Sequence, residues 1–182
     1  MIGRILTRAG RRRRGRRRPR AVLALSLFGL GLIGLAPLAR PVPWLVWNAS
    51  ASAPVGLYRV LPGDAVRGDL VLVRTPNSVR QLAAERGYLP SNVPLVKRVT
   101  ALDGDVVCAA GDAITINGRV VAERLSRDRL GRPLPSWSGC HLLDNGEAFL
   151  LMEGVADSFD GRYFGPVPTA AIVGRLAPLW VE

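Results

Sequence analysis

The sequence predicts a mainly β domain of twisted antiparallel sheets, with a small helical insertion and one apolar helix in front of it. Short stretches rich in Val, Ile and Leu recur through residues 56–180, and turn sequences such as GD, DG and NG separate them. One stretch between them, residues 77–94, has apolar residues at helical spacing instead. An uncharged apolar run, residues 21–39, precedes this domain.

The apolar run follows a strongly basic segment. Residues 1–20 contain ten arginines and no acidic residue. A helix over residues 21–39 would reach roughly 28 Å, close to the thickness of a bilayer core. We therefore expect a basic cytoplasmic tail (residues 1–20), a retained transmembrane anchor (residues 21–39) and an extracytoplasmic domain (residues 40–182). A cleaved signal peptide is the alternative, because small residues occur near the end of the run.

The net charge of +11 does not predict nucleic-acid binding, because it comes from the tail. Of 25 Lys and Arg residues, ten lie in residues 1–20, so 15 remain against 14 acidic residues elsewhere. A nucleic-acid-binding domain normally carries its basic patch on the folded part. The segment before the domain therefore indicates a membrane as partner, and not nucleic acid.

The elements of the domain follow from local patterns. Residues 56–62 and 68–76 predict strands, and residues 77–94 predict a short helix that stops near Gly87. Residues 94–102 return to β structure, and Asn117-Gly118 is a strong hairpin signal between two apolar runs. The polar stretch 123–146 is expected to be a loop, and residues 147–154 and 170–180 are further strand candidates.

Lys97 lies in the predicted strand of residues 94–102. Because side chains alternate along a strand, Lys97 shares a face with Leu95 and Val99, whereas Arg98 shares the other face with Val96 and Thr100. Burial lowers the pKa of a lysine, and a neutral lysine can act as a general base. The alternative is an edge strand from which Lys97 extends to water. The single histidine, His141, is expected at the surface.

The two cysteines, Cys108 and Cys140, do not form a C-x-x-C pair, so no metal site is expected. On the exported side of a membrane, two cysteines in one small domain favour a disulfide. Two buried free thiols are the alternative. No residue pattern indicates a cofactor.

Four motifs in order resemble those of the Ser/Lys-dyad signal peptidases, serine peptidase family S26, and in particular its conjugative-transfer, TraF-like branch. They are NASASAPVGLY, GDLVLVR, LVKRVTALDGDVVC and DSFDGRYFGPVP, within residues 48–180. The insertion before the lysine motif is also typical of that branch. The resemblance implies a signal-peptidase-like fold, a nucleophile at Ser52 and a base at Lys97. It further implies a lysine-orienting hydroxyl at Ser158 and a structural ion pair between Asp160 and Arg162.

Two departures from the family pattern affect these assignments. One residue separates Ser52 from Pro54, where general signal peptidases have two between nucleophile and proline, so Ser50 stays an alternative nucleophile. If Ser52 is the nucleophile, the Ser50 hydroxyl and the Ser52 N–H are candidate oxyanion donors. Gly161 stands where many relatives have a serine, so that hydroxyl is absent.

The function that the resemblance implies is a membrane-anchored serine endopeptidase in the inner membrane, with its catalytic domain in the periplasm. Its expected substrate is an exported protein, a pilin precursor of a conjugation or type IV secretion apparatus. The alternatives are a general signal peptidase that removes leader peptides and a non-catalytic anchored β domain of a secretion apparatus.

Overall fold

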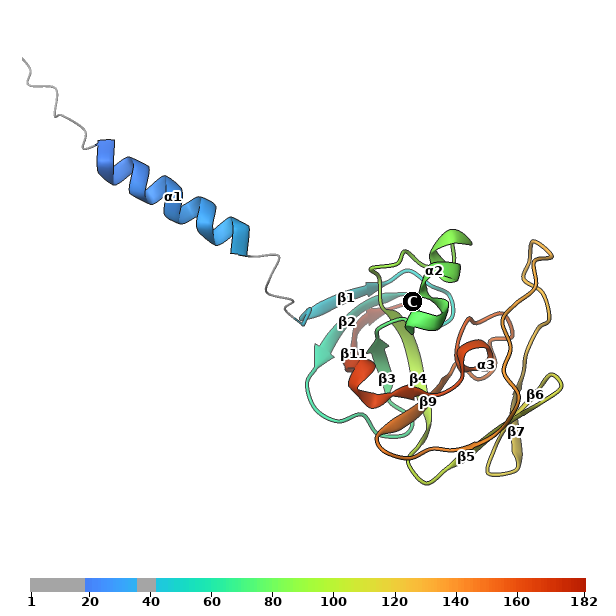
Figure 1. Cartoon of the computed structure of the whole chain (residues 1–182). Coiled ribbons are helices and arrows are strands. Elements are labelled where there is room, and N and C mark those ends of the chain that lie inside the picture. The colour runs from blue at the N-terminus through green and yellow to red at the C-terminus, as the bar shows by residue number, and fades with distance from the viewer. Residues whose placement is uncertain (1–18, 36–41) are drawn as a thin grey trace, which may run out of the picture. The chain divides into compact units, whose positions relative to one another are not determined.

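The computed structural model describes residues 19–35 and 42–182, and the chain divides into residues 1–41 and residues 42–182. In the first part, helix α1 (Pro19–Leu35) contains 17 residues (Figure 1). Its described side chains are almost all exposed. Among the described residues, no helix combines the length and the hydropathy needed to cross a membrane. Most of the expected tail, and residues 36–39 of the expected anchor, lie outside the described residues.

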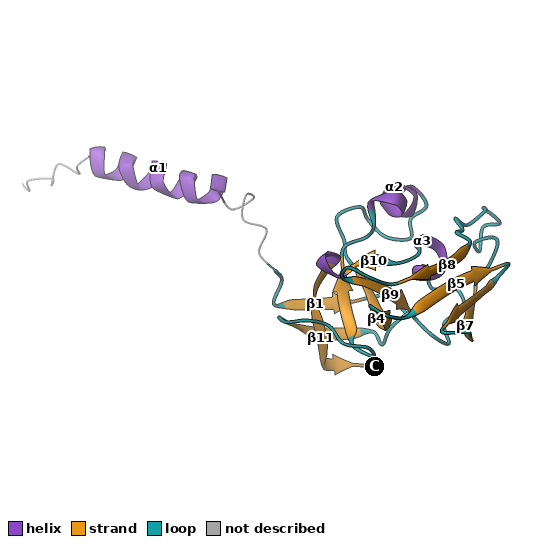
Figure 2. Cartoon of the chain, turned by 60° about the horizontal axis from the view of Figure 1, so that its bottom comes forward, coloured by secondary structure: helices purple, strands orange, loops and turns teal. Residues whose placement is uncertain are grey.

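The second part is mainly β, as predicted, and contains two antiparallel sheets (Figure 2). The larger sheet has seven strands in the order β1-β2-β11-β3-β4-β9-β10. Their bounds are Leu45–Asn48 (β1), Gly56–Leu61 (β2), Leu70–Val73 (β3), Leu95–Leu102 (β4), Glu147–Leu151 (β9), Val167–Pro168 (β10) and Ile172–Val181 (β11). Every pairing in it is antiparallel.

The smaller sheet has four strands in the order β7-β6-β5-β8. Their bounds are Val106–Ala110 (β5), Ala113–Ile116 (β6), Arg119–Glu123 (β7) and Gly139–Leu142 (β8). The predicted hairpin is confirmed: Asn117 and Gly118 join β6 to β7 and have φ angles of 50° and 79°, as a type I′ turn requires. Strand β8 corrects the prediction of a continuous loop over residues 123–146.

The core consists of three apolar clusters, and one of them joins the two sheets. In that cluster Val107 and Ile114 from the smaller sheet pack with Phe149 and Leu151 from β9, and none of the four is measurably exposed. Burying such side chains stabilises the fold by about 1.5–3 kcal/mol each. The smaller sheet is therefore packed firmly against the larger one.

The larger sheet is joined across its middle by β11, which pairs with β2 on one side and β3 on the other. Strands β1 and β2 flank the segment that holds Ser50 and Ser52, whereas β4 holds Lys97. Strand β11 thus connects the serine half of the sheet to the lysine half. The contact with β2 is close, because a Cβ added at Gly56 would lie 2.1 Å from the carbonyl oxygen of Trp180.

Helices are few in this part of the chain, as predicted. Helix α2 (Asn77–Glu85) lies in the expected insertion and buries Val79 and Ala83. Helix α3 (Gly161–Phe164) forms one turn beside β9 (Figure 1), and a 3₁₀ turn, Thr169–Ala171, precedes β11. The sequence did not predict α3 or strand β1.

Candidate active site

The segment between β1 and β2, residues 49–55, forms a turn that we call the serine turn. The buried side chain of Asn48, at the end of β1, organises it. Its amide nitrogen lies 3.0–3.1 Å from the carbonyl oxygens of Ser50, Ala53 and Pro54, and its Oδ1 accepts the Ser50 N–H at 3.1 Å. One amide side chain thereby fixes the backbone on both sides of Ser52.

The two serines of the turn are hydrogen-bonded to each other. Their Oγ atoms lie 2.9 Å apart, and the Ser52 N–H also donates to the Ser50 Oγ at 3.3 Å. In this state the Ser52 N–H, a candidate oxyanion donor, has an internal partner. The Ser50 hydroxyl therefore orients Ser52, and both groups would have to exchange partners before they could bind an oxyanion.

Lys97 lies in the middle of the larger sheet, because β4 pairs with β3 and β9. The side chain is 3% exposed, so the alternative of an edge lysine that extends to water is wrong. Its Nζ donates to Ser52 Oγ at 3.2 Å and to the buried Ser158 Oγ at 2.9 Å. The predicted nucleophile, base and orienting hydroxyl thus meet at one ammonium group.

The environment of Lys97 favours loss of its proton. Burial lowers the pKa of Lys97 from 10.5 to about 8, and nearby Asp160 opposes this shift while Arg162 adds to it. The hydroxyl partners Ser52 and Ser158 carry no negative charge that would hold the proton. A substantial fraction of Lys97 is therefore neutral near pH 8.

The segment 152–160 joins β9 to α3 and holds Ser158; we call it the Ser158 turn. The Asp160 carboxylate accepts Arg162 Nε at 2.9 Å and Nη2 at 2.8 Å, and both side chains are buried. The guanidinium also donates to four carbonyl oxygens, those of Glu123, Met152, Val155 and Ala156. Three of these belong to the Ser158 turn, so the ion pair fixes the turn that positions the lysine's second partner.

Gly161 separates the two members of this ion pair and has no room for a side chain. A Cβ at this position would lie 2.7 Å from the Leu150 carbonyl oxygen and 2.7 Å from the Phe149 ring. Its own carbonyl accepts the Trp137 indole N–H at 2.9 Å. The missing hydroxyl at this position therefore follows from close backbone packing.

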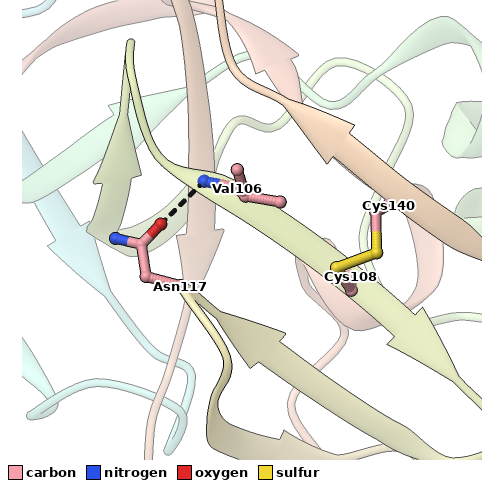
Figure 3. Close-up of a disulfide and its surroundings, with 4 residues drawn as sticks. All are labelled: Val106, Cys108, Asn117 and Cys140. Atoms are coloured by element: carbon pink, nitrogen blue, oxygen red, sulfur yellow. Dashed lines mark hydrogen bonds between the residues drawn. A yellow bond between two sulfur atoms is a disulfide. The ribbon is translucent and has the colours of Figure 1, made fainter.

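The expected disulfide is present between Cys108 on β5 and Cys140 on β8, with an S–S distance of 2.10 Å (Figure 3). Next to it, exposed His141 bonds Glu147 at 2.6 Å, and none of its hydrogen bonds involves the serine turn. Over residues 19–35 and 42–182, no group of three His, Cys, Asp or Glu side chains is arranged to hold a metal ion.

Asn48 was not identified from the sequence as a residue of the site, and the fact that the chain has a single lysine was not used. An amide at the end of a strand and before a run of small residues is nevertheless typical of a side chain that bonds turn backbone. Lys97 is the single lysine among 25 basic side chains, and the other 24 are arginines. Arginine cannot lose its proton in a protein, so the lysine is the one long basic side chain that can act as a base.

A hydroxyl 3.2 Å from a buried amine is suited to proton transfer, because the neutral amine can accept the hydroxyl proton as the oxygen attacks an electrophile. This chemistry requires no metal and no cofactor. The arrangement differs from a serine–histidine pair, since the described hydrogen bonds of Ser52 are to Ser50 and Lys97.

The chain belongs to the signal peptidase family, peptidase S26, whose family model matches residues 18–180. Within that family it resembles proteins of plasmid transfer. It is 35% identical to the plasmid transfer protein TraF of Escherichia coli over 142 residues. This alignment covers 72% of this chain and 80% of that protein. It is 36% identical over 166 residues to the conjugal transfer protein TraF of Agrobacterium fabrum, with 83% and 93% covered.

Among solved structures, a signal peptidase I from Enterococcus faecalis matches with 22% identity and a TM-score of 0.35. The match covers 64% of this chain and all of that one.

Proposed function

We propose that this protein is a membrane-anchored serine endopeptidase in which Ser52 is the nucleophile and Lys97 is the general base. The observation that carries the proposal is the position of Lys97 Nζ, which is buried and within hydrogen-bond distance of both Ser52 and Ser158. The membership of a signal peptidase family supports the same reaction class.

In the proposed reaction, neutral Lys97 accepts the proton of Ser52 while Ser52 Oγ attacks the scissile carbonyl carbon. The carbon–nitrogen bond breaks, the protonated lysine returns the proton to the leaving amine, and an acyl-enzyme remains. Water, deprotonated by Lys97, then attacks the ester carbonyl carbon. The bond from this carbon to Ser52 Oγ breaks, the acid is released, and the protonated lysine returns the proton to Ser52 Oγ. Ser158 holds the amine in line, and Ser50 orients the nucleophile.

The choice of Ser52 over Ser50 has geometric support. The described hydrogen bonds of Lys97 reach Ser52 and Ser158, whereas Ser50 bonds the backbone and hydroxyl of Ser52. Ser50 is therefore assigned as an orienting residue that can turn its hydroxyl toward an oxyanion.

We propose an exported protein as the substrate, and specifically a pilin precursor of a conjugation or type IV secretion apparatus. Similarity to proteins named for plasmid and conjugal transfer supports this choice. The uncharged run of residues 21–39 behind ten arginines supports an anchor in the inner membrane with a periplasmic catalytic domain.

The proposal is tested with the full chain in detergent micelles, a pilin precursor and a precursor with an ordinary leader peptide. Ser52→Ala should reduce cleavage by about 10⁴-fold or more, because the nucleophile is lost. The matched Ser50→Ala variant should lose about 10²–10³-fold, as expected for one oxyanion or orienting group. In the unaltered protein, kcat/KM should fall about tenfold per pH unit below the Lys97 pKa of about 8.

Two results would contradict the proposal in different ways. Normal processing by both Ser52→Ala and Ser50→Ala would remove the enzyme and favour the anchored structural component. Equal cleavage of both precursors would keep the enzyme but replace the pilin-specific peptidase with a general signal peptidase.

A further inference from the structure

A cavity of about 430 Å³ opens between the two sheets and is distinct from the serine–lysine site. Three arginines from three different elements line it: Arg67 before β3, Arg98 on β4 and Arg119 at the start of β7. Lys97 and Arg98 are consecutive, so they leave β4 on opposite faces. Arg98 therefore points away from the buried amine, and the cavity lining includes none of Ser50, Ser52, Lys97 and Ser158.

The charge of this cavity is local and does not come from an overall excess. Residues 42–182 contain 14 basic and 14 acidic side chains, so the folded part is neutral. Against that background, the lining holds three guanidinium groups and one carboxylate, that of Glu153. Such a concentration of one sign around a concave surface attracts groups of the opposite sign.

Two polar groups of the lining are held in place by a buried carboxylate behind them. Asp105 is 6% exposed, pairs with Arg67 and accepts the Asn117 amide at 2.8 Å. Figure 3 shows the other end of that amide, where Asn117 accepts the Val106 N–H at 2.9 Å. Burial raises the pKa of Asp105, but hydrogen bonds led by that from Arg67 outweigh it, so the pKa lies below its ordinary value. Asp105 stays ionised and keeps Arg67 fixed.

The arginines keep donors free for a ligand. Each guanidinium has five N–H donors. Among the described residues, Arg67 bonds Asp105, Arg98 bonds the Gly68 carbonyl, and the exposed guanidinium of Arg119 makes no hydrogen bond. The rest of the lining includes three apolar side chains, Val99, Ile116 and Val121, and the polar Thr100 and Asn117. The cavity thus combines unused cationic donors with apolar surface.

The lining argues against a polyanion. Glu153 at the cavity and Asp105 behind it would repel the closely spaced charges of a phosphate chain, but they tolerate single carboxylates separated by uncharged groups. Apolar surface between cationic donors suits a peptide in which acidic and aliphatic residues alternate. We propose that this cavity binds an acidic peptide segment of a partner protein.

The proposal does not depend on catalysis, so the test uses the full chain carrying Ser52→Ala in detergent micelles. The probes are a dye-labelled hexapeptide, Ala-Glu-Leu-Glu-Ala-Ala, and its counterpart with glutamine at both acidic positions. Fluorescence anisotropy should show about tenfold tighter binding of the acidic peptide, and added salt should remove the difference.

Substitutions locate the binding. Arg119→Gln should weaken the acidic peptide about fivefold, the factor expected for one partly exposed ion pair. Arg59→Gln, an exposed change on β2 away from the cavity lining, is the matched control and should have no effect. Arg119→Glu should reverse the preference toward a hexapeptide with lysine at the two positions.

Three results would overturn the proposal. The first is equal binding of the acidic and neutral peptides, and the second is equal binding of the acidic peptide by Arg119→Gln and Arg59→Gln. The third is displacement of the acidic peptide by added phosphatidylglycerol, together with tighter, Arg119-dependent binding of that lipid, which would replace the peptide with a lipid surface. Loss of peptidase activity alone bears on the proposed function and leaves this result unchanged.

Discussion

Two cations lie buried in the same part of the molecule, and their surroundings are opposite. Lys97 on β4 is 3% exposed and Arg162 on α3 is 2% exposed. The described hydrogen-bond partners of the Lys97 amine are the hydroxyls of Ser52 and Ser158, and its pKa is lowered to about 8 by burial. Arg162 has a bidentate carboxylate partner and four carbonyl oxygens.

The difference teaches that burial alone does not decide what a cation does. Where the charge must persist, the chain uses a guanidinium and surrounds it with acceptors. Where the proposed reaction needs a removable charge, the chain uses its single lysine, whose hydrogen-bond partners are neutral hydroxyls. The two are linked through the Ser158 turn, because Arg162 fixes the backbone that presents Ser158 to Lys97.

The largest effect is expected from exchanging the kind of cation. Lys97→Arg keeps a positive charge but removes the dissociable proton, so kcat/KM for a fluorogenic precursor peptide should fall roughly 10³–10⁴-fold. Lys97→Met, which has no charge to desolvate, should lose as much activity. This variant should still fold and show a cooperative thermal unfolding transition. Substantial cleavage by Lys97→Met would mean that the two buried cations do not differ in role.

The next effect concerns the persistent charge. Arg162→Met leaves the Asp160 carboxylate buried without its partner, so the free energy of unfolding in urea should fall by about 3–5 kcal/mol. The double variant Asp160→Asn, Arg162→Met removes both charges and should lose less than the sum of the two single changes. Additive losses would indicate that the pair is not coupled.

The stability of the protein should also depend on pH through Lys97. The folded pKa of about 8 lies below the unfolded value of 10.5, so the unfolded state binds more protons between these values, and stability rises with pH. The rise should amount to roughly 3 kcal/mol from the shift itself. The free energy of unfolding is measured against pH for the unaltered protein and for Lys97→Met, and the difference between the two curves removes the contribution of tyrosine titration. Identical curves would contradict a buried lysine with a lowered pKa.

A smaller effect is expected at Gly161, between the members of the ion pair. Gly161→Ser and Gly161→Ala should each lower the free energy of unfolding by about 1–3 kcal/mol, because the added Cβ meets Leu150 and Phe149. Ala170→Ser at an exposed position is the control and should change little. A clear difference between the serine and alanine variants would show that the hydroxyl matters more than the space.

The sequence predicted those parts of the fold that local patterns determine. Asn117-Gly118 specified its hairpin, and the helical spacing of residues 77–94 specified α2. Strand β8 was missed because all four of its residues are exposed, so it carries no apolar alternation. Its strand form comes from pairing with β5 and from the disulfide, which join residues distant in the sequence.

The candidate site was predictable in its residue types and less so in its geometry. Alternation along residues 95–99 placed Lys97 on an apolar face, and the structure buries it. Which serine faces the amine depends on the backbone of the serine turn, which Asn48 fixes through bonds to three carbonyls. The spacing of apolar and polar residues along the chain cannot predict such a set of hydrogen bonds.

The position of β11 in the larger sheet bears on the order in which the strands can pair during folding. A chain that emerges from its amino end presents β1 and β2 (residues 45–61) and the paired strands β3 and β4 (residues 70–102) before residues 172–181, yet β11 alone pairs with both β2 and β3. Pairing of segments so far apart is slow relative to local hairpins. The serine turn and β4, which carries Lys97, are therefore expected to come together late in folding. On the proposed assignment of Ser52 and Lys97, the active site is complete only once β11 has paired with both halves of the larger sheet.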